Sequence, residues 1–219
     1  MVAIDGPAAS GKSSTAKRVA ERLGIHHADS GALYRAATVA RLRQDGEPER
    51  WTPESVLSAA ARVTLVRRDA SFEVQLDAAP MQQELHEAAV TALVSLIAKM
   101  QPVRSWVNEW MRRCARDGPI VVDGRDMGTA VFPTAQLKIF LVANPHERAR
   151  RRLLQRLGRA PMDDEIEGET EALKQRDAKD AAQTQQAADA VVIDTTHLTQ
   201  DEQVERIAEM AVRAGAPRE

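Results

Sequence analysis

The sequence predicts an α/β fold built around a parallel β-sheet. Short apolar runs alternate along the chain with amphipathic helical patterns, which is the order that parallel strands joined by crossover helices require. The runs are nearly all apolar, as expected of strands covered on both faces. A glycine-rich turn follows the first run directly. Because 219 residues can bury one substantial core, we expect a single domain over residues 1–219.

The first two strands are predicted on either side of an amphipathic helix. One strand covers residues 2–4, and the other covers the letters IHHA at 25–28. Between them, small and apolar residues recur at i, i+3, i+4 and i+7, the spacing of one helical face. That face consists of Ala16, Val19, Ala20 and Leu23.

Three further strands are predicted in the second half of the chain. The letters PIVVD at 119–123, LKIFLV at 137–142 and AVVID at 190–194 are almost entirely apolar. Two helices accompany these strands, each with one apolar face. The helix before the last strand carries Ala149, Leu153, Leu154 and Leu157. The terminal helix carries Val204, Ile207, Ala208 and Ala211.

Residues 63–76 interrupt this alternation. Apolar residues at 63 and 65, and again at 72, 74 and 76, alternate with polar ones around the letters RDAS. Strict alternation on both sides of a short turn indicates an antiparallel hairpin. We therefore expect a small inserted lobe at about residues 50–100. The acidic run DDEIEGETE at 163–171 is interpreted as a solvated helix face, in preference to a metal site.

The composition narrows the class of protein. Lys and Arg number 30 and Asp and Glu 32, so the net charge of −2 and the 3% aromatic content disfavour a nucleic-acid partner. Cys114 is the only cysteine, which indicates a reducing compartment. The glycine-rich turn begins at residue 6, and the longest apolar stretch, at 90–98, is too short to cross a bilayer. We expect a cytoplasmic protein without a membrane partner.

The glycine-rich turn matches the phosphate-binding loop pattern G-x-x-x-x-G-K-[ST] between a strand and a helix. Small side chains let backbone N–H groups converge on phosphate oxygens, and the helix N-terminus attracts the same anion. The residues expected to bind ATP are Gly6, Pro7, Ala8, Ala9, Ser10, Gly11, Lys12, Ser13 and Ser14. Lys12 should reach the β- and γ-phosphates, and Ser13 should bind Mg²⁺. The alternative is an ordinary glycine-rich turn with an exposed lysine.

The loop indicates ATP or GTP binding but does not name a reaction. The absence of an N-K-x-D motif weighs against a GTPase, and there is no L-S-G-G-Q stretch. Arginines instead follow the predicted strands, at 29–35, 123–128 and 146–152. Such loops lie at the carboxyl ends of parallel strands and face one crevice. Guanidinium groups there would offset the repulsion between ATP and an anionic acceptor, which is on the order of several kcal/mol.

Four stretches make the sequence resemble the bacterial cytidylate kinases, a branch of the nucleoside monophosphate kinases. They are IDGPAASGKSS, DSGALYR, the long run from DGRDMG to HERARRR, and RDAKD with ADAVVIDTT. The resemblance covers nearly the whole chain. It implies a five-stranded parallel sheet flanked by helices. It also implies a CMP-binding lobe with a short antiparallel sheet and a short helical lid at about 147–180.

The resemblance also implies roles for individual residues. The CMP-binding set is Ser30, Arg35, Ser95, Arg104, Arg125, Asp126, Arg176 and Asp180. In this set Asp126 and Arg104 complement the amine and acceptor edge of cytosine, with Ser95 as a further contact. The catalytic set is Lys12, Arg125, Arg176 and a lid arginine. The lid arginine is one of Arg148, Arg151 and Arg152, and Arg151 is taken here.

The implied reaction is transfer of the ATP γ-phosphoryl group to CMP, and to dCMP, with Mg²⁺ as cofactor. No general base is needed, because the acceptor phosphate has its second pKa near ~6. Ser13 would bind Mg²⁺ and Asp123 would orient it through water, with turn capping as the alternative for Asp123. A structural role is expected for His26 and His27, which point to opposite faces of a strand. We expect a monomer.

Two alternatives stay open: a kinase for UMP, dTMP or AMP, and a module that binds ATP without transferring phosphate. The sequence departs from the family pattern in three places. Gln183 stands where the family has arginine, and the following segment, QTQQAADA at 183–190, is shorter than the family's loop. Leu85 and His86 replace an Ile-Arg pair. All three bear on how the acceptor phosphate and ribose are held.

Overall fold

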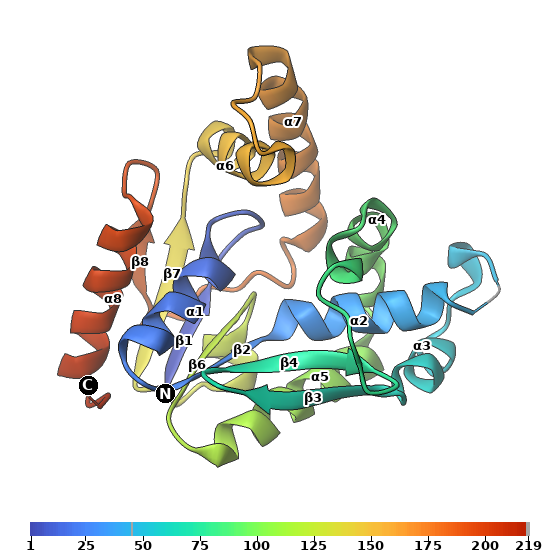
Figure 1. Cartoon of the computed structure of the whole chain (residues 1–219), viewed down its shortest axis with the longest axis horizontal. Helices are drawn as coiled ribbons and strands as arrows, with labels where there is room; N and C mark the ends of the chain where they lie inside the picture. The colour runs from blue at the N-terminus through green and yellow to red at the C-terminus, as the bar shows by residue number, and fades with distance from the viewer. Residues whose placement is uncertain (45, 218–219) are drawn as a thin grey trace.

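A computed structural model describes residues 1–44 and 46–217 of the chain (Figure 1). Residues 45, 218 and 219 of the predicted 1–219 domain lie outside the described residues. Within the described part, one sheet has the strand order β3-β4-β2-β6-β1-β7-β8, and β5 pairs with β4. None of the helices in this part combines the length and the hydropathy that crossing a membrane demands.

Five strands of the sheet are the predicted parallel set. These are β1 (Val2–Asp5), β2 (His26–Asp29), β6 (Ile120–Gly124), β7 (Leu137–Val142) and β8 (Val191–Asp194). In the register of β6, Asp123 pairs with Ile4 of β1 and with Asp29 of β2. The three strands therefore end at the same level, and the loops that follow them open onto one edge of the sheet.

Helices cover both faces of the sheet. On one face, α1 (Lys12–Arg22) and α8 (Gln200–Arg213) pack against Val2 and Ile4 of β1. The faces predicted for these two helices are both buried. On the other face, α2 (Ser30–Leu42) and α5 (Gln101–Cys114) pack against Ala3 and β6. Alternate residues of β1 thus enter different cores, as the pleat requires.

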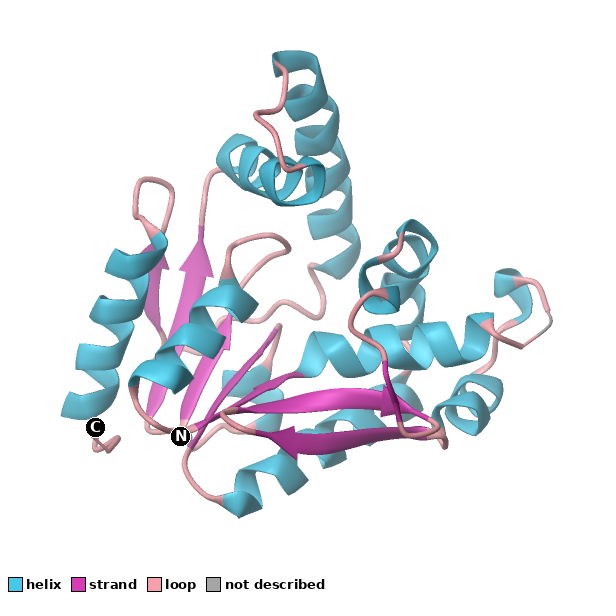
Figure 2. Ribbon diagram, in the orientation of Figure 1, coloured by secondary structure: helices cyan, strands magenta, loops and turns pink. Residues whose placement is uncertain are grey.

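The predicted hairpin is confirmed, and it extends the main sheet instead of forming a sheet of its own. Strands β3 (Val63–Arg68) and β4 (Ser71–Leu76) are antiparallel, and Ser71 pairs with His27 of β2. Figure 2 shows the hairpin at the opposite end of the sheet from β8. A short strand and two helices complete this region: β5 (Ala79–Pro80), α3 (Pro53–Ala60) and α4 (Ala88–Ile97). Single turns are η1 (Pro48–Arg50), η2 (Glu84–His86), η3 (Ala115–Asp117) and η4 (Met127–Val131).

Two antiparallel helices, α6 (Pro145–Leu157) and α7 (Asp163–Asp180), rise above the carboxyl end of β7 (Figure 1). The face predicted for α6 is half wrong. Ala149 and Leu153 are buried, but Leu154 and Leu157 are 45% and 37% exposed. The reason is that α6 packs on α7 and the phosphate-loop residue Ala8 with one narrow stripe, while its last turn projects from the protein.

Two other expectations need correction. Val191 and Val192 of β8 are exposed, because β8 is an edge strand paired only with β7. The acidic run at 163–171 is not wholly solvated. Its Glu169 has a side chain only 10% exposed, and it pairs with Arg152 at 3.1 Å and Arg156 at 3.2 Å. These ion pairs fasten α7 to α6.

Packing of α8 on the sheet gives a prediction for stability. Replacing the fully buried Ile207 by alanine should lower the free energy of unfolding by about 2–5 kcal/mol, through lost apolar contact and a residual cavity. The matched control is Leu157→Ala in the exposed last turn of α6. This substitution should change the free energy of unfolding by less than about 0.5 kcal/mol. Equilibrium urea unfolding measures both; equal effects would contradict the burial described for the two helices.

Candidate active site

The phosphate-binding loop connects β1 to α1 through backbone that glycine alone tolerates. Gly6 has φ +149°, and a Cβ there would lie 2.2 Å from the carbonyl oxygen of Leu141. Gly11 has φ +87° and caps α1 without any side-chain hydrogen bond. The N–H groups of the loop and of the first helical turn therefore converge on one point without side chains in the way, as an anion site requires.

Lys12 is the first residue of α1 and lies buried against the loop. Its Nζ donates a hydrogen bond to the carbonyl oxygen of Pro7 at 2.8 Å. Burial and then the nearby charge of Arg125 lower the pKa of Lys12 to about 7. A bound polyphosphate would reverse this effect, because a negative charge beside an ammonium group favours the charged form.

Ser13 and Asp123, the two residues predicted to hold a metal, are brought together. Ser13 Oγ donates to Asp123 Oδ2 at 2.6 Å, across the junction of α1 and β6. Hard oxygen donors of this kind suit Mg²⁺, which keeps several water and phosphate ligands. In the described residues no three His, Cys, Asp or Glu side chains cluster as a metal site. The donor set therefore fits a metal carried by a nucleotide, and not one held by the protein alone.

Two neighbouring groups complete this edge of the sheet. Asp29 accepts from the N–H of Gly31 at 2.7 Å and caps α2, while burial, reinforced by the charge of Asp123, raises its pKa to about 6. Ser30 is buried and donates to the carbonyl oxygen of Asp123 at 2.9 Å. Ser14 by contrast is exposed and bonds back to Gly11, at 2.9 Å.

A second group of predicted residues meets around Asp180 at the end of α7. Ser95 Oγ donates to Asp180 Oδ1 at 2.9 Å, and guanidinium nitrogens of Arg125 and Arg176 both lie 3.7 Å from Oδ2. The Nε atoms of both arginines are buried without a hydrogen-bond partner. Burial lowers the pKa of Arg176 to about 10, as do the charges of Arg125 and Arg35. This cluster holds more positive charge than the protein itself neutralises.

Arg35 lies on α2 beside this cluster. It donates to the carbonyl oxygen of Leu85 at 2.9 Å and to Thr91 Oγ1 at 3.1 Å, and so is held by the turn before α4 and by α4 itself. Burial lowers its pKa, as do nearby guanidinium charges on Arg152 and Arg125. Arg35 is thus part of the same field of positive charge.

The pair proposed to complement cytosine is also formed. Arg104 of α5 makes a short ion pair with Asp126, which follows β6. Burial raises the pKa of Asp126, and Arg104 opposes that shift. Burial also raises the pKa of the neighbouring Tyr34 to about 12. Asp126 and Arg104 therefore form a largely buried acceptor and donor side by side, next to Arg125.

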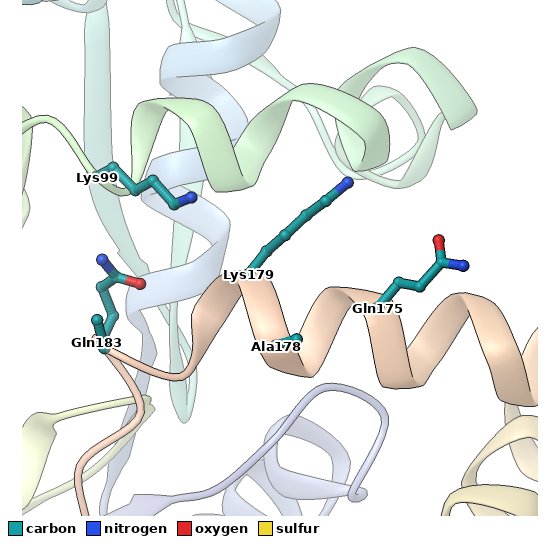
Figure 3. A pocket seen from close by; sticks show the side chains of 6 residues that line it. Lys99, Gln175, Ala178, Lys179 and Gln183 are labelled. Carbon is teal, nitrogen blue, oxygen red and sulfur yellow. The ribbon is translucent and has the colours of Figure 1, made fainter.

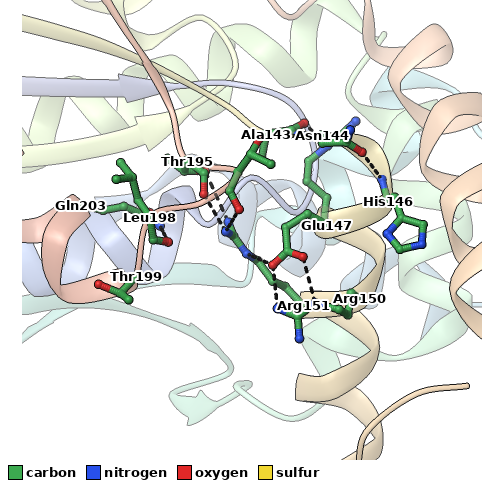
Figure 4. Close-up of polar contacts among 12 residues, drawn as sticks. Ala143, Asn144, His146, Glu147, Arg150, Arg151, Thr195, Leu198, Thr199 and Gln203 are labelled. Atoms are coloured by element: carbon green, nitrogen blue, oxygen red, sulfur yellow. Dashed lines mark hydrogen bonds and ion pairs between the residues drawn. The ribbon is translucent and has the colours of Figure 1, made fainter.

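Of the three lid arginines, the structure does not bring Arg151 to this cluster. Arg151 donates to the carbonyl oxygens of Thr195 at 2.6 Å and Thr196 at 3.0 Å, beyond β8, and to Glu147 at 2.9 Å (Figure 4). Arg151 lies on the same face of α6 as Glu147, whereas Arg148 and Arg152 pair with residues of α7. The choice of Arg151 as the arginine facing the acceptor is therefore corrected.

Arg148 and Arg152 occupy different places on α6. Arg148 is buried, donates to the carbonyl oxygen of Ala8 at 2.7 Å and pairs with Asp177 at 2.6 Å. It thereby links the phosphate-binding loop to α7. Arg152 lines a cavity of about 190 Å³ between α4 and α7, together with Ser95 and Arg176. Of the three candidate arginines of α6, Arg152 is the one that lines this cavity with Arg176.

A larger and more open pocket, of about 840 Å³, lies beyond this cavity at the end of α7. Lys99, after the end of α4, and Lys179 and Gln183 on the facing segment all line it (Figure 3). Gln183 is the position at which the family pattern has arginine. No motif in the sequence marks Lys99 as a site residue, because only the packing of α4 against α7 brings it near Gln183.

A buried carboxylate that the sequence analysis also missed joins the two halves of the site. Asp5, the last residue of β1, accepts from the N–H groups of Met127 and Gly128, both at 2.8 Å. Burial raises its pKa to about 6. Asp5 directly precedes the phosphate-binding loop, and the groups it binds directly follow Asp126. It therefore sets the acceptor-side loop against the donor-side loop.

A phosphate-binding loop whose buried lysine lies near a group of half-buried arginines defines a nucleotide-dependent phosphotransferase of the P-loop kinase class. The sequence model of cytidylate kinase matches residues 2–213. The chain belongs to the cytidylate kinase family.

Curated relatives agree with this assignment. The chain is 41% identical to the cytidylate kinase of Limosilactobacillus fermentum, over 94% of this chain and 93% of that protein. It is 42% identical to that of Chlorobaculum tepidum, over 93% and 89%. For Thermus thermophilus the values are 40% identity over 93% and 94%. A crystal structure of shikimate kinase from Bacteroides thetaiotaomicron has a TM-score of 0.47 at 15% identity, covering 96% of this chain and 97% of that one.

Asp5 gives a prediction about pH. Because its pKa in the folded protein is about 6, against roughly 3.9 in an unfolded chain, the folded state holds a proton that the unfolded state has released between about pH 4 and 6. Stability therefore falls as the pH rises through this window. In Asp5→Asn, the fall in unfolding free energy from pH 4 to 7 should be smaller by on the order of 2–3 kcal/mol.

Urea unfolding at a series of pH values measures this difference. Asp117→Asn is the control, because Asp117 is exposed after α5 and should leave the wild-type pH dependence unchanged. Parallel curves for Asp5→Asn and wild type would show that Asp5 does not carry the shifted pKa.

Proposed function

We propose that the protein transfers the γ-phosphoryl group of ATP to CMP, forming ADP and CDP. The observation that carries this proposal is the excess of positive charge on Arg35, Arg125 and Arg176, which Asp180 neutralises only in part, close to Lys12. An acceptor phosphate next to the γ-phosphate of ATP is strongly repelled unless cations surround both. Planar guanidinium groups bind phosphate through paired hydrogen bonds, and two of these arginines have a buried Nε to donate.

The mechanism assigned to these residues is alignment and charge stabilisation. Backbone N–H groups of residues 8–13 hold the β-phosphate, and Lys12 leaves the Pro7 carbonyl for the β- and γ-phosphates. Arg35 and Arg125 hold the acceptor phosphate in line with the γ-phosphate. Charge that develops on the transferring group is stabilised by Lys12, Arg176 and Arg152. No proton has to be removed, because the acceptor phosphate is already largely dianionic near neutral pH.

Mg²⁺ is the cofactor we assign to the reaction. When bound with ATP, it neutralises charge on the β- and γ-phosphate oxygens. Ser13 Oγ would hold it directly, and Asp123, 2.6 Å from that hydroxyl, would hold it through water. Ser13 lies in the first turn of α1, where the phosphates are expected, and Asp123 reaches it from β6.

The base is assigned to Asp126 and Arg104. The Asp126 carboxylate would accept from the exocyclic amine of cytosine, and Arg104 would donate to its ring acceptors. Uracil would place a carbonyl against the carboxylate and leave buried polar groups unpaired, which a hydrogen-bonding site rejects strongly. Ser95 and Asp180, which are hydrogen-bonded to one another, are assigned as further contacts of the cytosine and the ribose.

The regions around the site are assigned as moving parts. We propose that residues about 50–100 form the lobe that binds the nucleoside monophosphate, and that residues about 147–180 form the lid. Arg148 connects the lid to Ala8, so that filling the phosphate-binding loop and closing the lid would be linked. Closure would exclude water, which would otherwise hydrolyse ATP.

The setting follows from the same chemistry. We propose a cytoplasmic monomer acting on free CMP and dCMP, with no nucleic-acid or membrane partner. The net charge of −2 supports the absence of a nucleic-acid partner, since it offers no general attraction for polyanions. Both substrate sites are assigned to one chain, so a second copy is not needed to complete them.

A panel of acceptors tests the proposed substrate. With ATP and Mg²⁺, coupled ADP release should be fastest with CMP and dCMP, while UMP, dTMP and AMP should be poorer by a factor of roughly 10⁴, as expected for a mismatched hydrogen-bonding edge. Faster turnover of UMP or AMP would contradict the assignment of Asp126 and Arg104. ATP binding with no turnover of any acceptor would instead favour a binding module.

The role of Lys12 is tested separately from the acceptor site. Lys12→Ala should lower kcat by roughly 10²–10³-fold, the usual loss when one group that stabilises transition-state charge is removed. CMP affinity measured by calorimetry should stay within a factor of about three. Lys17→Ala, on the exposed side of the same helix, is the control and should retain wild-type kcat. An equal loss of CMP affinity in Lys12→Ala would show that the two sites are not separate.

A further inference from the structure

We propose that His27 is a positioning residue, which orients Asp123 toward the metal ion that arrives with the nucleotide. The proposal rests on the function proposed above. His27 lies on β2 and is only 6% exposed, and its Nε2 lies 2.7 Å from Asp123 Oδ1. Because a carboxylate only accepts hydrogen bonds, His27 Nε2–H donates to Asp123.

The register of the sheet makes this contact possible. Strands β2 and β6 are parallel neighbours, and Asp29 of β2 is paired with Asp123 of β6. Side chains two residues apart on a strand share a face, so His27 and Asp29 both lie on the face of Asp123. His26 points to the other face, where its ring packs against Phe72 in a T-shaped arrangement with the ring centroids 6.0 Å apart. Adjacent histidines thus have separate environments.

The contact divides the two oxygens of Asp123 between two partners. Oδ1 accepts from His27, and Oδ2 accepts from Ser13 at 2.6 Å. The Ser13 hydroxyl has a single proton, so donating it to Oδ2 leaves the oxygen lone pairs free to face a metal. The orientation of the Ser13 hydroxyl therefore depends on the orientation of the Asp123 carboxylate. His27 fixes the orientation of that carboxylate through its hydrogen bond to Oδ1.

Burial makes this arrangement necessary. Asp123 is 1% exposed, and the carboxylate of Asp29 lies near enough to act on its charge. Without His27, Oδ1 would be a buried acceptor with no donor, which costs free energy unless the carboxylate rotates toward another donor. Rotation would withdraw Oδ2 from Ser13. Residues that hydrogen-bond to a metal-binding group typically change the metal affinity by 10–100-fold.

The test separates metal-dependent from metal-independent nucleotide binding. Calorimetry measures the affinity of the purified full chain for ADP, once with excess EDTA and once with Mg²⁺. The wild type should bind more tightly with Mg²⁺. In His27→Leu this gain should fall by roughly 10-fold, while the affinity in EDTA stays within a factor of about two.

Three variants make the result specific to the hydrogen bond. His27→Gln keeps an N–H at nearly the position of Nε2 and should recover most of the gain. His27→Asn is polar but too short to reach Asp123, so it should behave like the leucine variant. His26→Leu, on the opposite face of the same strand, is the matched control and should keep the full gain. Should the leucine variant fail to fold, the comparison of glutamine with asparagine decides the question.

The outcomes distinguish this inference from the proposed function. If the wild type gains affinity with Mg²⁺ and both the leucine and asparagine variants retain that gain, His27 is a structural residue and the inference is overturned while the proposed function stands. If the wild type shows no gain, the metal role proposed for Ser13 and Asp123 fails, and the positioning role fails with it. A gain lost from His27→Leu and restored in His27→Gln supports the inference.

Discussion

The structure depends on holding charges of both signs, out of water, at the carboxyl edge of one sheet. Lys12, Asp5, Asp29 and Asp123 are all buried there or nearly so, and burial moves the pKa values of the first three toward neutrality. A buried charge is tolerated only when hydrogen bonds and opposite charges replace its water. The parallel strands supply that replacement, because they bring side chains and backbone N–H groups from three loops to one level.

The same constraint joins the donor and acceptor halves of the site. Asp5 lies at the root of the phosphate-binding loop and binds the N–H groups that follow Asp126. On the far side, Arg148 connects Ala8 of that loop to Asp177 of α7. The loop is therefore held between the turn after β6 and helix α7 by hydrogen bonds to buried charged groups. Such groups are costly to separate.

Sequence patterns are informative where all the residues of a motif lie within one short segment. The pattern around Gly6, Lys12 and Ser13 lies within a few residues, and its strand and helix are visible as apolar periodicity. The buried faces of α1 and α8 follow the same rule. Sequence patterns could not decide which way neighbouring side chains point. Arg151 and Arg152 are adjacent on α6, yet Arg151 contacts the segment after β8 and Arg152 lines the cavity beside Ser95 and Arg176. No periodicity could distinguish them, because the choice depends on where α7 packs.

The five parallel strands, the inserted hairpin and the phosphate-binding loop were determined by the sequence alone, since each shows as a pattern within one segment. Only the tertiary structure decided which buried groups are partners. His27 with Asp123, Asp5 with the turn after β6, and Lys99 beside Gln183 are joined by strand register and helix packing. These contacts span between 84 and 122 residues of chain, as from Lys99 to Gln183 and from Asp5 to Met127. Over such separations the pairing follows from which elements pack together, which no local pattern encodes.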